Sequence, residues 1–463
     1  MAGIGFELRK LVETRTIRGV LGAAFSGTLV VAGPWLISAA SLAAAQALPF
    51  FSLPGTALAF TGAMVYAIAI SICASAAPLY VFVRLSADLV YENRKGEAAT
   101  LLLKYSGASA LLSLPLGLIA GLLLVEDAAA SRLLVLAFAL LLSAVNALWA
   151  AMVTATVIRR YGRILAAYAL GMVLMYFLAR ALGPGLGAAG AVLALAAGYA
   201  LTAGLLILAA IEALGAAPCP KAFSRLADYA RKYRNLGLAG ALYAIATWVD
   251  KAVLAAFGGA AAEGTRFFVN PGYDTAFYYA NLAMIPGLVF FTIVTETDFN
   301  LDLKRFIAYL GHRRQPEIEG AKSRLIQSTT GSLVRQTAFQ GAVVAALVLV
   351  SPFMAESLGF PVGIFVWLLA GGVFQLILLT CLNMLFYLEL YRDAALSALA
   401  FVLVNLGLSL AACLSDGAEA FKGIPYFAAC LASGLLSAAF AFQGLRRFDR
   451  IVFLRASGVD FGK

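Results

Sequence analysis

The sequence predicts an all-α polytopic membrane protein with about twelve transmembrane helices, and three observations support this fold class. Hydrophobic residues make up 62% of the 463 residues, whereas charged residues make up only 13%. Long apolar stretches follow one another through the chain, and each is close to the roughly 20 residues that a helix needs to cross a bilayer. The polar gaps between these stretches alternate between rich and poor in Lys and Arg. These features together indicate a chain that crosses a membrane many times.

The predicted spans fall into two sets with a basic linker between them. The first set covers residues 20–45, 55–83, 106–125, 133–158, 164–182 and 188–211. The second set covers residues 236–258, 275–297, 336–354, 363–388, 394–414 and 426–444. In each half the longest cytoplasmic gap follows the second span, which suggests a parallel repeat with a cavity between two bundles. We therefore expect an N-terminal six-helix bundle at residues 1–211, a cytoplasmic amphipathic linker at 212–235, a C-terminal six-helix bundle at 236–444 and a basic cytoplasmic tail at 445–463.

The distribution of positive charge predicts the orientation of the chain. Alternate gaps carry clusters of Lys and Arg, whereas the opposite gaps hold only Arg132, Arg266 and Lys422. Because positive charge stays on the cytoplasmic side, both termini are expected in the cytoplasm. The net charge of +10 then reflects topology and attraction to anionic lipid, and it does not indicate nucleic-acid binding.

Two segments at the predicted cytoplasmic side have apolar and aromatic residues at helical spacing among basic residues. They are Ala222–Asn235 in the linker and Ile318–Val334 in the longest gap of the second half. We expect each to form a helix that lies on the cytoplasmic face, although a solvated connector fits nearly as well. Several spans also contain Pro, which predicts kinks or breaks at Pro34, Pro78, Pro115, Pro286 and Pro352.

The composition gives no indication of a metal site, a cofactor or a disulfide framework. The five cysteines are scattered, and the single histidine, His312, lies in a predicted cytoplasmic loop. A histidine-based metal site or proton relay within the membrane is therefore excluded.

Asp250 and Lys251 lie near the middle of the seventh predicted span. A charge at that depth costs several kcal/mol unless it faces protein or water, so each is a functional candidate. Adjacent residues on a helix point about 100° apart, and we therefore expect the two side chains to find partners elsewhere and not each other. Two interpretations stay open: at least one of them lines a cavity, or both are structural.

A second candidate group occupies the outer gap and the start of the eighth span, at residues 267–281. It includes Tyr273, Asp274, Tyr278 and Asn281. Aromatic faces stack on sugar rings, and amide or carboxylate groups hydrogen-bond hydroxyls, so the mixture suits a carbohydrate path. An interfacial aromatic belt is an equally good interpretation.

Glu296 and Asp298 form a third candidate group at the cytoplasmic end of the same span. Two carboxylates two residues apart are able to hold a cation, but a solvated helix end is the more common origin of such a pair. A Trp near the middle of the first span of each half, Trp35 and Trp248, is the best correspondence between the halves. We predict that the substrate pathway or its gate contains Trp35, Trp248, Asp250, Lys251, Tyr273, Asp274, Tyr278, Asn281, Glu296 and Asp298.

Short motifs spread along the whole chain resemble those of one family. They are Met1–Lys10, Ala32–Trp35, Trp248–Lys251, Pro271–Asp274, Met284–Gly287 and Glu296–Phe299, with a looser similarity around Arg447–Asp449. Each motif is short, but together and in this order they resemble the PelG family. Members of that family are inner-membrane transporters of the Pel exopolysaccharide system and belong to the MOP superfamily.

The resemblance implies a MOP/MATE-like fold in which two six-helix bundles work by alternating access. It implies export of the Pel polysaccharide, a polymer rich in N-acetylgalactosamine, from the cytoplasm to the periplasm across the bacterial inner membrane. The implied partners are the cytoplasmic glycosyltransferase PelF and the membrane proteins PelD and PelE, which form a synthase complex with the transporter in the phospholipid bilayer.

Two alternatives compete with this interpretation. One is another MOP activity, either flipping of a lipid-linked oligosaccharide or cation-coupled drug efflux, and the lack of an obvious central carboxylate in the first bundle disfavours efflux. The other is a membrane glycosyltransferase, but the first outer gap at residues 46–54 has no acid. The longest loop, at about 40 residues, is also too short for a catalytic domain. We therefore expect a transporter without catalytic residues, and not an enzyme.

Overall fold

The computed structural model describes residues 17–126, 131–158, 161–415 and 419–456. The motif at Met1–Lys10 and the end of the basic tail lie outside the described residues. Within the described part of the chain, 11 helices are long and apolar enough to cross a membrane, which confirms the all-α polytopic fold.

The membrane helices follow the predicted spans closely, and two of them are built from shorter pieces. They are α2 (Ile17–Gln46), α3 (Thr56–Tyr91), α4 (Lys95–Leu124), α5 (Arg132–Ile158), α6 (Tyr161–Leu214), α8 (Arg234–Ala246) with α9 (Val249–Gly258), α10 (Pro271–Leu282) with α11 (Ile285–Phe290) and α12 (Glu296–His312), α13 (Gln315–Leu358), α14 (Val362–Tyr387), α15 (Tyr391–Leu414) and α16 (Ile424–Arg446). Short elements complete the described chain: η1 (Pro49–Ser52), the linker helix α7 (Ala222–Lys232), the π-helical turn η2 (Phe291–Thr295), η3 (Glu419–Gly423) and α17 (Phe448–Ala456).

The longest element, α6, is a helical hairpin that supplies two of the predicted spans. Its backbone turns at Gly187, where φ is 58° and ψ is −136°, a conformation that favours glycine. The Thr202 hydroxyl lies 3.4 Å from the carbonyl oxygen of Ala167, so the two arms pack against each other. Counting both arms of α6, the 11 helices provide the roughly twelve crossings that the sequence predicts.

The close approach of the two arms of α6 predicts the effect of a methyl group at Gly171. A Cβ atom there would lie 2.0 Å from the Thr202 hydroxyl and 2.5 Å from the carbonyl oxygen of Gly198. Gly171→Ala is therefore expected to destabilise the protein by about 1–3 kcal/mol. Thermal unfolding in detergent measures this loss. Gly204→Ala is the matched control because a Cβ atom at Gly204 meets nothing within 4 Å. Equal melting temperatures for the two variants would contradict this packing.

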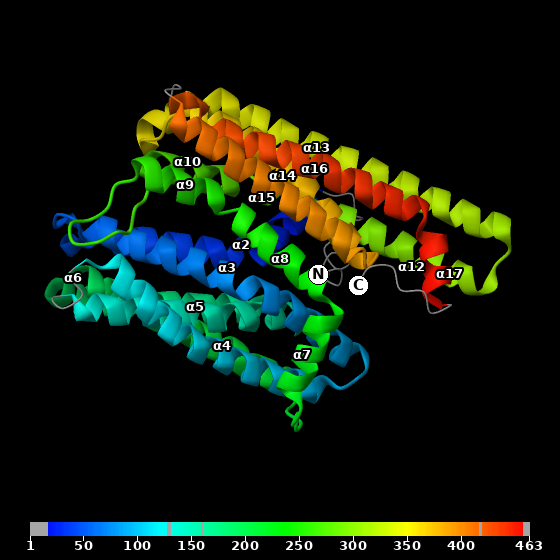
Figure 1. Ribbon diagram of the computed structural model, residues 1–463, viewed down its shortest axis with the longest axis horizontal. Coiled ribbons are helices and arrows are strands. Elements are labelled where there is room, and N and C mark those ends of the chain that lie inside the picture. The colour runs from blue at the N-terminus through cyan, green and yellow to red at the C-terminus, as the bar shows by residue number, and fades with distance from the viewer. Residues whose placement is uncertain (1–16, 127–130, 159–160, 416–418, 457–463) are drawn as a thin grey trace. The chain divides into compact units, whose positions relative to one another are not determined.

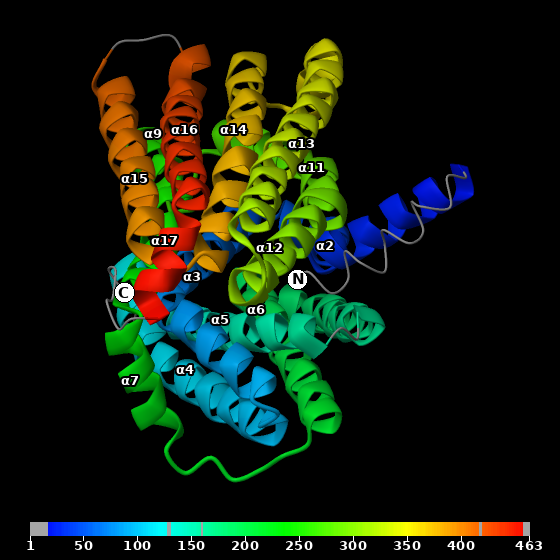
Figure 2. The same cartoon turned by 90° about the vertical axis from the view of Figure 1, so that its right-hand side faces the viewer.

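The described chain divides into two compact units. The N unit comprises Ala32–Gly237 and Gly258–Asn270, and the C unit comprises α2 up to Val31, Leu238–Phe257 and the residues from Pro271 onward. In the N unit, α5 packs against α3, α4 and α6 (Figure 1). In the C unit, α14 packs against α10, α13, α15 and α16, and Figure 2 shows α13 to α16 running alongside one another.

The linker helix α7 is attached to the N unit by one of its faces. Arg225 forms an ion pair with Glu97 at 2.6 Å, and the Tyr229 hydroxyl donates a hydrogen bond to Asp88 at 3.2 Å. Burial and the nearby Asp88 carboxylate raise the pKa of Tyr229 to about 12, so this hydroxyl keeps its proton. The basic residues that follow are exposed, namely Arg231, Lys232 and Arg234.

The segment Ile318–Val334 is helical but differs from the separate surface helix that we expected. It is the first part of α13, which runs for 44 residues without a break. At 1.5 Å per residue such a helix is about 66 Å long, well beyond the roughly 30 Å of a bilayer core. The segment therefore extends a membrane helix. Lys322 on this extension pairs with Asp449 of α17 at 2.9 Å.

Candidate functional site

Two membrane helices of the C unit are interrupted within the membrane segment. The first breaks between Ala246 and Val249, and the second breaks between Leu282 and Ile285. Pro286 follows the second break and has no N–H to donate to the preceding turn. Irregular backbone at membrane depth is tolerated where protein or a wet cavity satisfies its polar groups. The two breaks are therefore candidate positions for a functional site.

Each break is supported by a buried amide from another helix. The side chain of Asn405 on α15 donates a hydrogen bond to the carbonyl oxygen of Ala246 at 2.9 Å. The side chain of Gln340 on α13 donates to the carbonyl oxygen of Ala283 at 2.8 Å. Asn405 and Gln340 are both 0% exposed. Sequence analysis missed these two residues, and the only signal for them is an amide within an apolar helix.

Asp250 and Lys251 contact each other at the first break, which corrects the expectation that they would not. The Nζ atom of Lys251 lies 3.5 Å from Oδ1 of Asp250. The two residues do point in different directions on α9, which begins at Val249, but the long lysine side chain folds back toward the residues that precede this helix. There its ammonium donates a hydrogen bond to the carbonyl oxygen of Thr247 at 2.7 Å.

The charged pair is enclosed by aromatic side chains and a tyrosine hydroxyl. Asp250 is 0% exposed, and the Tyr273 hydroxyl donates a hydrogen bond to its Oδ2 atom. The Lys251 ammonium lies 3.2 Å from the centre of the Phe277 ring and 5.4 Å from that of Trp248. Both positions are favourable cation–π geometries. The helix break, the ion pair and the aromatic rings thus form one compact site in the C unit.

An aromatic and amide network continues from this site. Phe277 packs edge-on against Tyr426 with ring centres 5.2 Å apart. The Tyr426 hydroxyl donates a hydrogen bond to the Gln375 side chain, whose amide nitrogen donates to the hydroxyl of Tyr243 at 3.3 Å. Side chains from α8, α10, α14 and α16 therefore form one network of aromatic faces and amide groups.

The other residues predicted for the outer gap and eighth span divide among different places. Tyr273 joins Asp250, whereas Tyr278 packs against Tyr279 and Asn281 donates to the carbonyl oxygen of Phe277 in its own helix. Asp274 is partly exposed on α10. Phe267, at the start of the group, instead belongs to the core of the N unit. The group is thus divided between the two units.

Trp35 belongs to a different unit from the site at the first break. It is partly exposed on the α2 helix, in the part of that helix that belongs to the N unit. The site at the first break belongs to the C unit.

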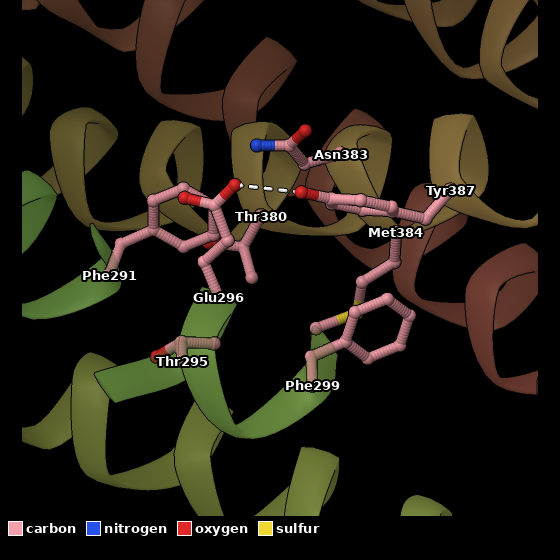
Figure 3. A pocket seen from close by; sticks show the side chains of 8 residues that line it. All are labelled: Phe291, Thr295, Glu296, Phe299, Thr380, Asn383, Met384 and Tyr387. Carbon is pink, nitrogen blue, oxygen red and sulfur yellow. Dashed lines mark hydrogen bonds between the residues drawn. The ribbon is translucent and has the colours of Figure 1, made fainter. Parts of the chain in front are cut away.

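Glu296 lies in a small pocket beside a π-helical turn. The turn Phe291–Thr295 precedes α12, and such turns inside helices are frequent at functional sites. Glu296 is 3% exposed and accepts a hydrogen bond of 2.9 Å from the hydroxyl of Tyr387 on α14. Figure 3 shows the pocket, which is lined by Phe291, Thr295, Glu296, Phe299, Thr380, Asn383, Met384 and Tyr387. Its volume of about 10 Å³ is near the minimum for one water, so a sugar does not fit.

Asp298 and Glu296 point to different helices. Asp298 accepts a hydrogen bond from the Ser332 hydroxyl at 3.1 Å and lies 3.5 Å from Arg335, and both partners are on α13. The two carboxylates therefore do not converge on a shared cation. The burial of Glu296 also differs from the solvated helix end that we considered for the pair.

The fold resembles those of solved transporters of the MOP superfamily. A MOP superfamily transporter from Pyrococcus furiosus, described as having a binding pocket of reversed polarity, has a TM-score of 0.60 and 14% identity, with 91% of this chain and 96% of that chain covered. A MATE transporter in complex with MaD3S has a TM-score of 0.59 and 15% identity, with 92% and 96% covered. An inward-facing multidrug resistance MATE transporter has a TM-score of 0.54 and 14% identity, with 86% and 92% covered. At these identities the similarity shows the fold alone.

The sequence matches a family model over almost its whole length. No match was found among curated proteins. The family model for PelG, described as "Putative exopolysaccharide Exporter (EPS-E)", matches residues 1–453. Together with the apolar helices and the MOP fold, this match identifies a multi-pass membrane transporter and not an enzyme. The chain belongs to the PelG family of exopolysaccharide exporters.

Proposed function

We propose that this transporter exports the Pel polysaccharide, a polymer rich in N-acetylgalactosamine, from the cytoplasm to the periplasm across the bacterial inner membrane. The observation that carries the proposal is the aromatic and amide surface beside the broken helices, in a chain whose family exports exopolysaccharides. Aromatic faces stack on sugar rings, and amides hydrogen-bond sugar hydroxyls. Such contacts are individually weak, which suits a polymer that must slide.

We propose that the partly exposed residues of α10 contact the polymer, namely Asp274, Tyr278 and Asn281. Trp35 and Trp248 are proposed as further contacts, one from each half. Asp250 and Tyr273, which are buried, and Lys251, which is largely shielded, are proposed to control the shape of the path and not to bind sugar tightly. Glu296 and Asp298 join α12 to α14 and α13, and we propose that they take part in gating. A path between the two helix bundles stays a prediction.

We also propose that the transporter works within a synthase complex with PelF, PelD and PelE. The proposed docking surface consists of three exposed basic residues that follow Tyr229 in the chain, namely Arg231, Lys232 and Arg234. On α7, Arg225 and Tyr229 are held by Glu97 and Asp88, so these two side chains are engaged within the N unit.

Neutralising the docking surface is expected to weaken capture of the complex. We expect the triple change Arg231→Gln, Lys232→Gln and Arg234→Gln to lower recovery of PelF in a pulldown several-fold, because long-range attraction to an acidic partner or lipid is lost. The matched control removes the same number of positive charges from the gaps on the predicted periplasmic side, by Arg132→Gln, Arg266→Gln and Lys422→Gln. Equal recovery with both triple variants would count against the proposed surface.

The proposed function is tested by locating labelled polymer in cells that lack this transporter but keep the glycosyltransferase and its sugar nucleotide. Polymer trapped in the cytoplasm, with export restored by the intact gene, would support a conduit role. Normal export without the protein would contradict it. Loss of lipid-linked oligosaccharide transfer or of drug resistance, with export unchanged, would instead favour one of the other MOP activities.

A further inference from the structure

We propose that the Lys251 ammonium is a built-in cation at the break between α8 and α9. It occupies the position in which a discontinuous transport helix would otherwise bind an alkali metal ion. Transport by this protein is then not coupled to Na⁺ or K⁺ binding at this position. The inference concerns ion binding alone, and it does not depend on which polymer is exported.

The oxygen atoms around the ammonium are those that an alkali metal ion would use. The carbonyl oxygen of Thr247 lies 2.7 Å from Nζ, and Oδ1 of Asp250 lies 3.5 Å from it. Carbonyl groups at the C-terminal ends of broken helices carry a partial negative charge, and in many transporters they coordinate Na⁺. The α8 helix ends at Ala246 and directs this end of its dipole toward the site.

The remaining walls suit an ammonium group better than a metal ion. The rings of Phe277 and Trp248 make cation–π contacts with the Lys251 ammonium, and they offer no oxygen atom that could coordinate a metal ion. The side chain of Lys251 is 11% exposed, so its ammonium is largely shielded from water. Among the described residues, no group of three or more His, Cys, Asp or Glu offers another site for a metal ion.

A structural ion pair is the competing interpretation, and the two differ in what happens when the ammonium is removed. If Lys251 only balances the charge of Asp250, removing its side chain leaves a destabilised protein that is indifferent to the type of salt. If Lys251 replaces a bound ion, the shortened side chain leaves the Thr247 and Asp250 oxygens available to one. The variant should then acquire a response to alkali metal ions that the natural protein lacks.

The test compares melting temperatures of the purified full-length protein in NaCl, KCl, LiCl and choline chloride at equal ionic strength. We expect no difference among these salts for the natural protein. Lys251→Ala should melt lower in choline chloride and should rise saturably by about 2–4 °C in at least one alkali metal salt. The double variant Asp250→Asn and Lys251→Ala should lose this rise, because a carboxylate ligand is missing.

Lys104→Ala is the matched control. The Lys104 ammonium also donates to a backbone carbonyl oxygen, that of Cys219 at 2.8 Å, but both residues belong to the N unit, and neither is part of the broken helix. Its removal should lower the melting temperature equally in every salt. A folded Lys251→Ala protein that responds to no alkali metal ion would overturn the proposal. So would saturable binding of radioactive Na⁺ to the natural protein that Asp250→Asn abolishes, which is measured whether or not the Lys251 variant folds. Neither result depends on polysaccharide, so the proposed function is tested separately.

Discussion

Asp250→Asn is expected to reduce polysaccharide export about tenfold, which corresponds to about 1.4 kcal/mol in a rate-limiting barrier, while the protein still reaches the membrane. The carboxylate is 0% exposed and lies 3.5 Å from the Lys251 ammonium. Its loss leaves a buried positive charge without its partner, which typically costs 3–5 kcal/mol of stability. Membrane insertion is set by the apolar helices and should persist. Export per membrane-inserted molecule and thermal unfolding measure the two effects.

A second variant separates the functional role of this pair from its structural role. Asp250→Asn combined with Lys251→Met removes both charges at nearly constant volume. Replacing a buried ion pair by neutral groups is often neutral or stabilising, so most of the lost stability should return. If the Asp250–Lys251 pair controls the shape of the polysaccharide path, export by the double variant should stay low. Normal export by the stable double variant would show that both charges are dispensable and that their proposed role is wrong.

Removing the amide that supports either helix break is expected to destabilise the C unit by about 1–3 kcal/mol, because a buried carbonyl loses a hydrogen bond from a side chain. Asn405→Leu affects the carbonyl of Ala246, and Gln340→Leu affects that of Ala283. The two amides support different breaks, so the losses of stability should approximately add. Export should fall in both variants. Asp250 directly follows the first break, and the second break joins α10, which carries Tyr273, to the segment that leads into the π-helical turn.

Thermal unfolding of the two single variants and the double variant measures this effect. Gln443→Leu is a suitable control, because Gln443 is an exposed amide on α16. Melting temperatures of the single variants equal to that of the control would show that the amides do not hold the breaks.

The sequence predicts the fold well because membrane crossing depends on local composition. Apolar length alone locates the helices, and even the hairpin within α6 follows from the short interruption near Gly187. Proline is a weaker guide: Pro34, Pro78, Pro115 and Pro352 lie inside uninterrupted helices. Only Pro286, of the prolines singled out, lies directly after a break.

The site is harder to predict because its contacts join residues far apart in the chain. Asn405 is 159 positions from the carbonyl that it supports, and Gln340 is 57 positions from its own. Periodicity within one helix carries no information about such pairs. The expectation for Asp250 and Lys251 failed because it considered only the directions of neighbouring residues on a helix, whereas the long lysine side chain folds back toward Thr247 and reaches Asp250.

The central claim is that the polysaccharide passes through this protein, and a photo-crosslinking experiment tests it most directly. A photoreactive phenylalanine analogue would replace Tyr278 or Trp35, one in each half, in cells that are producing polymer. Replacement at Phe353, which is 73% exposed on a membrane helix, is the control for lipid-facing positions. The account predicts sugar-containing adducts at Tyr278 and Trp35, and none at Phe353 or in cells without the glycosyltransferase. Absence of adducts at both pathway positions, in cells that still export polymer, would contradict it.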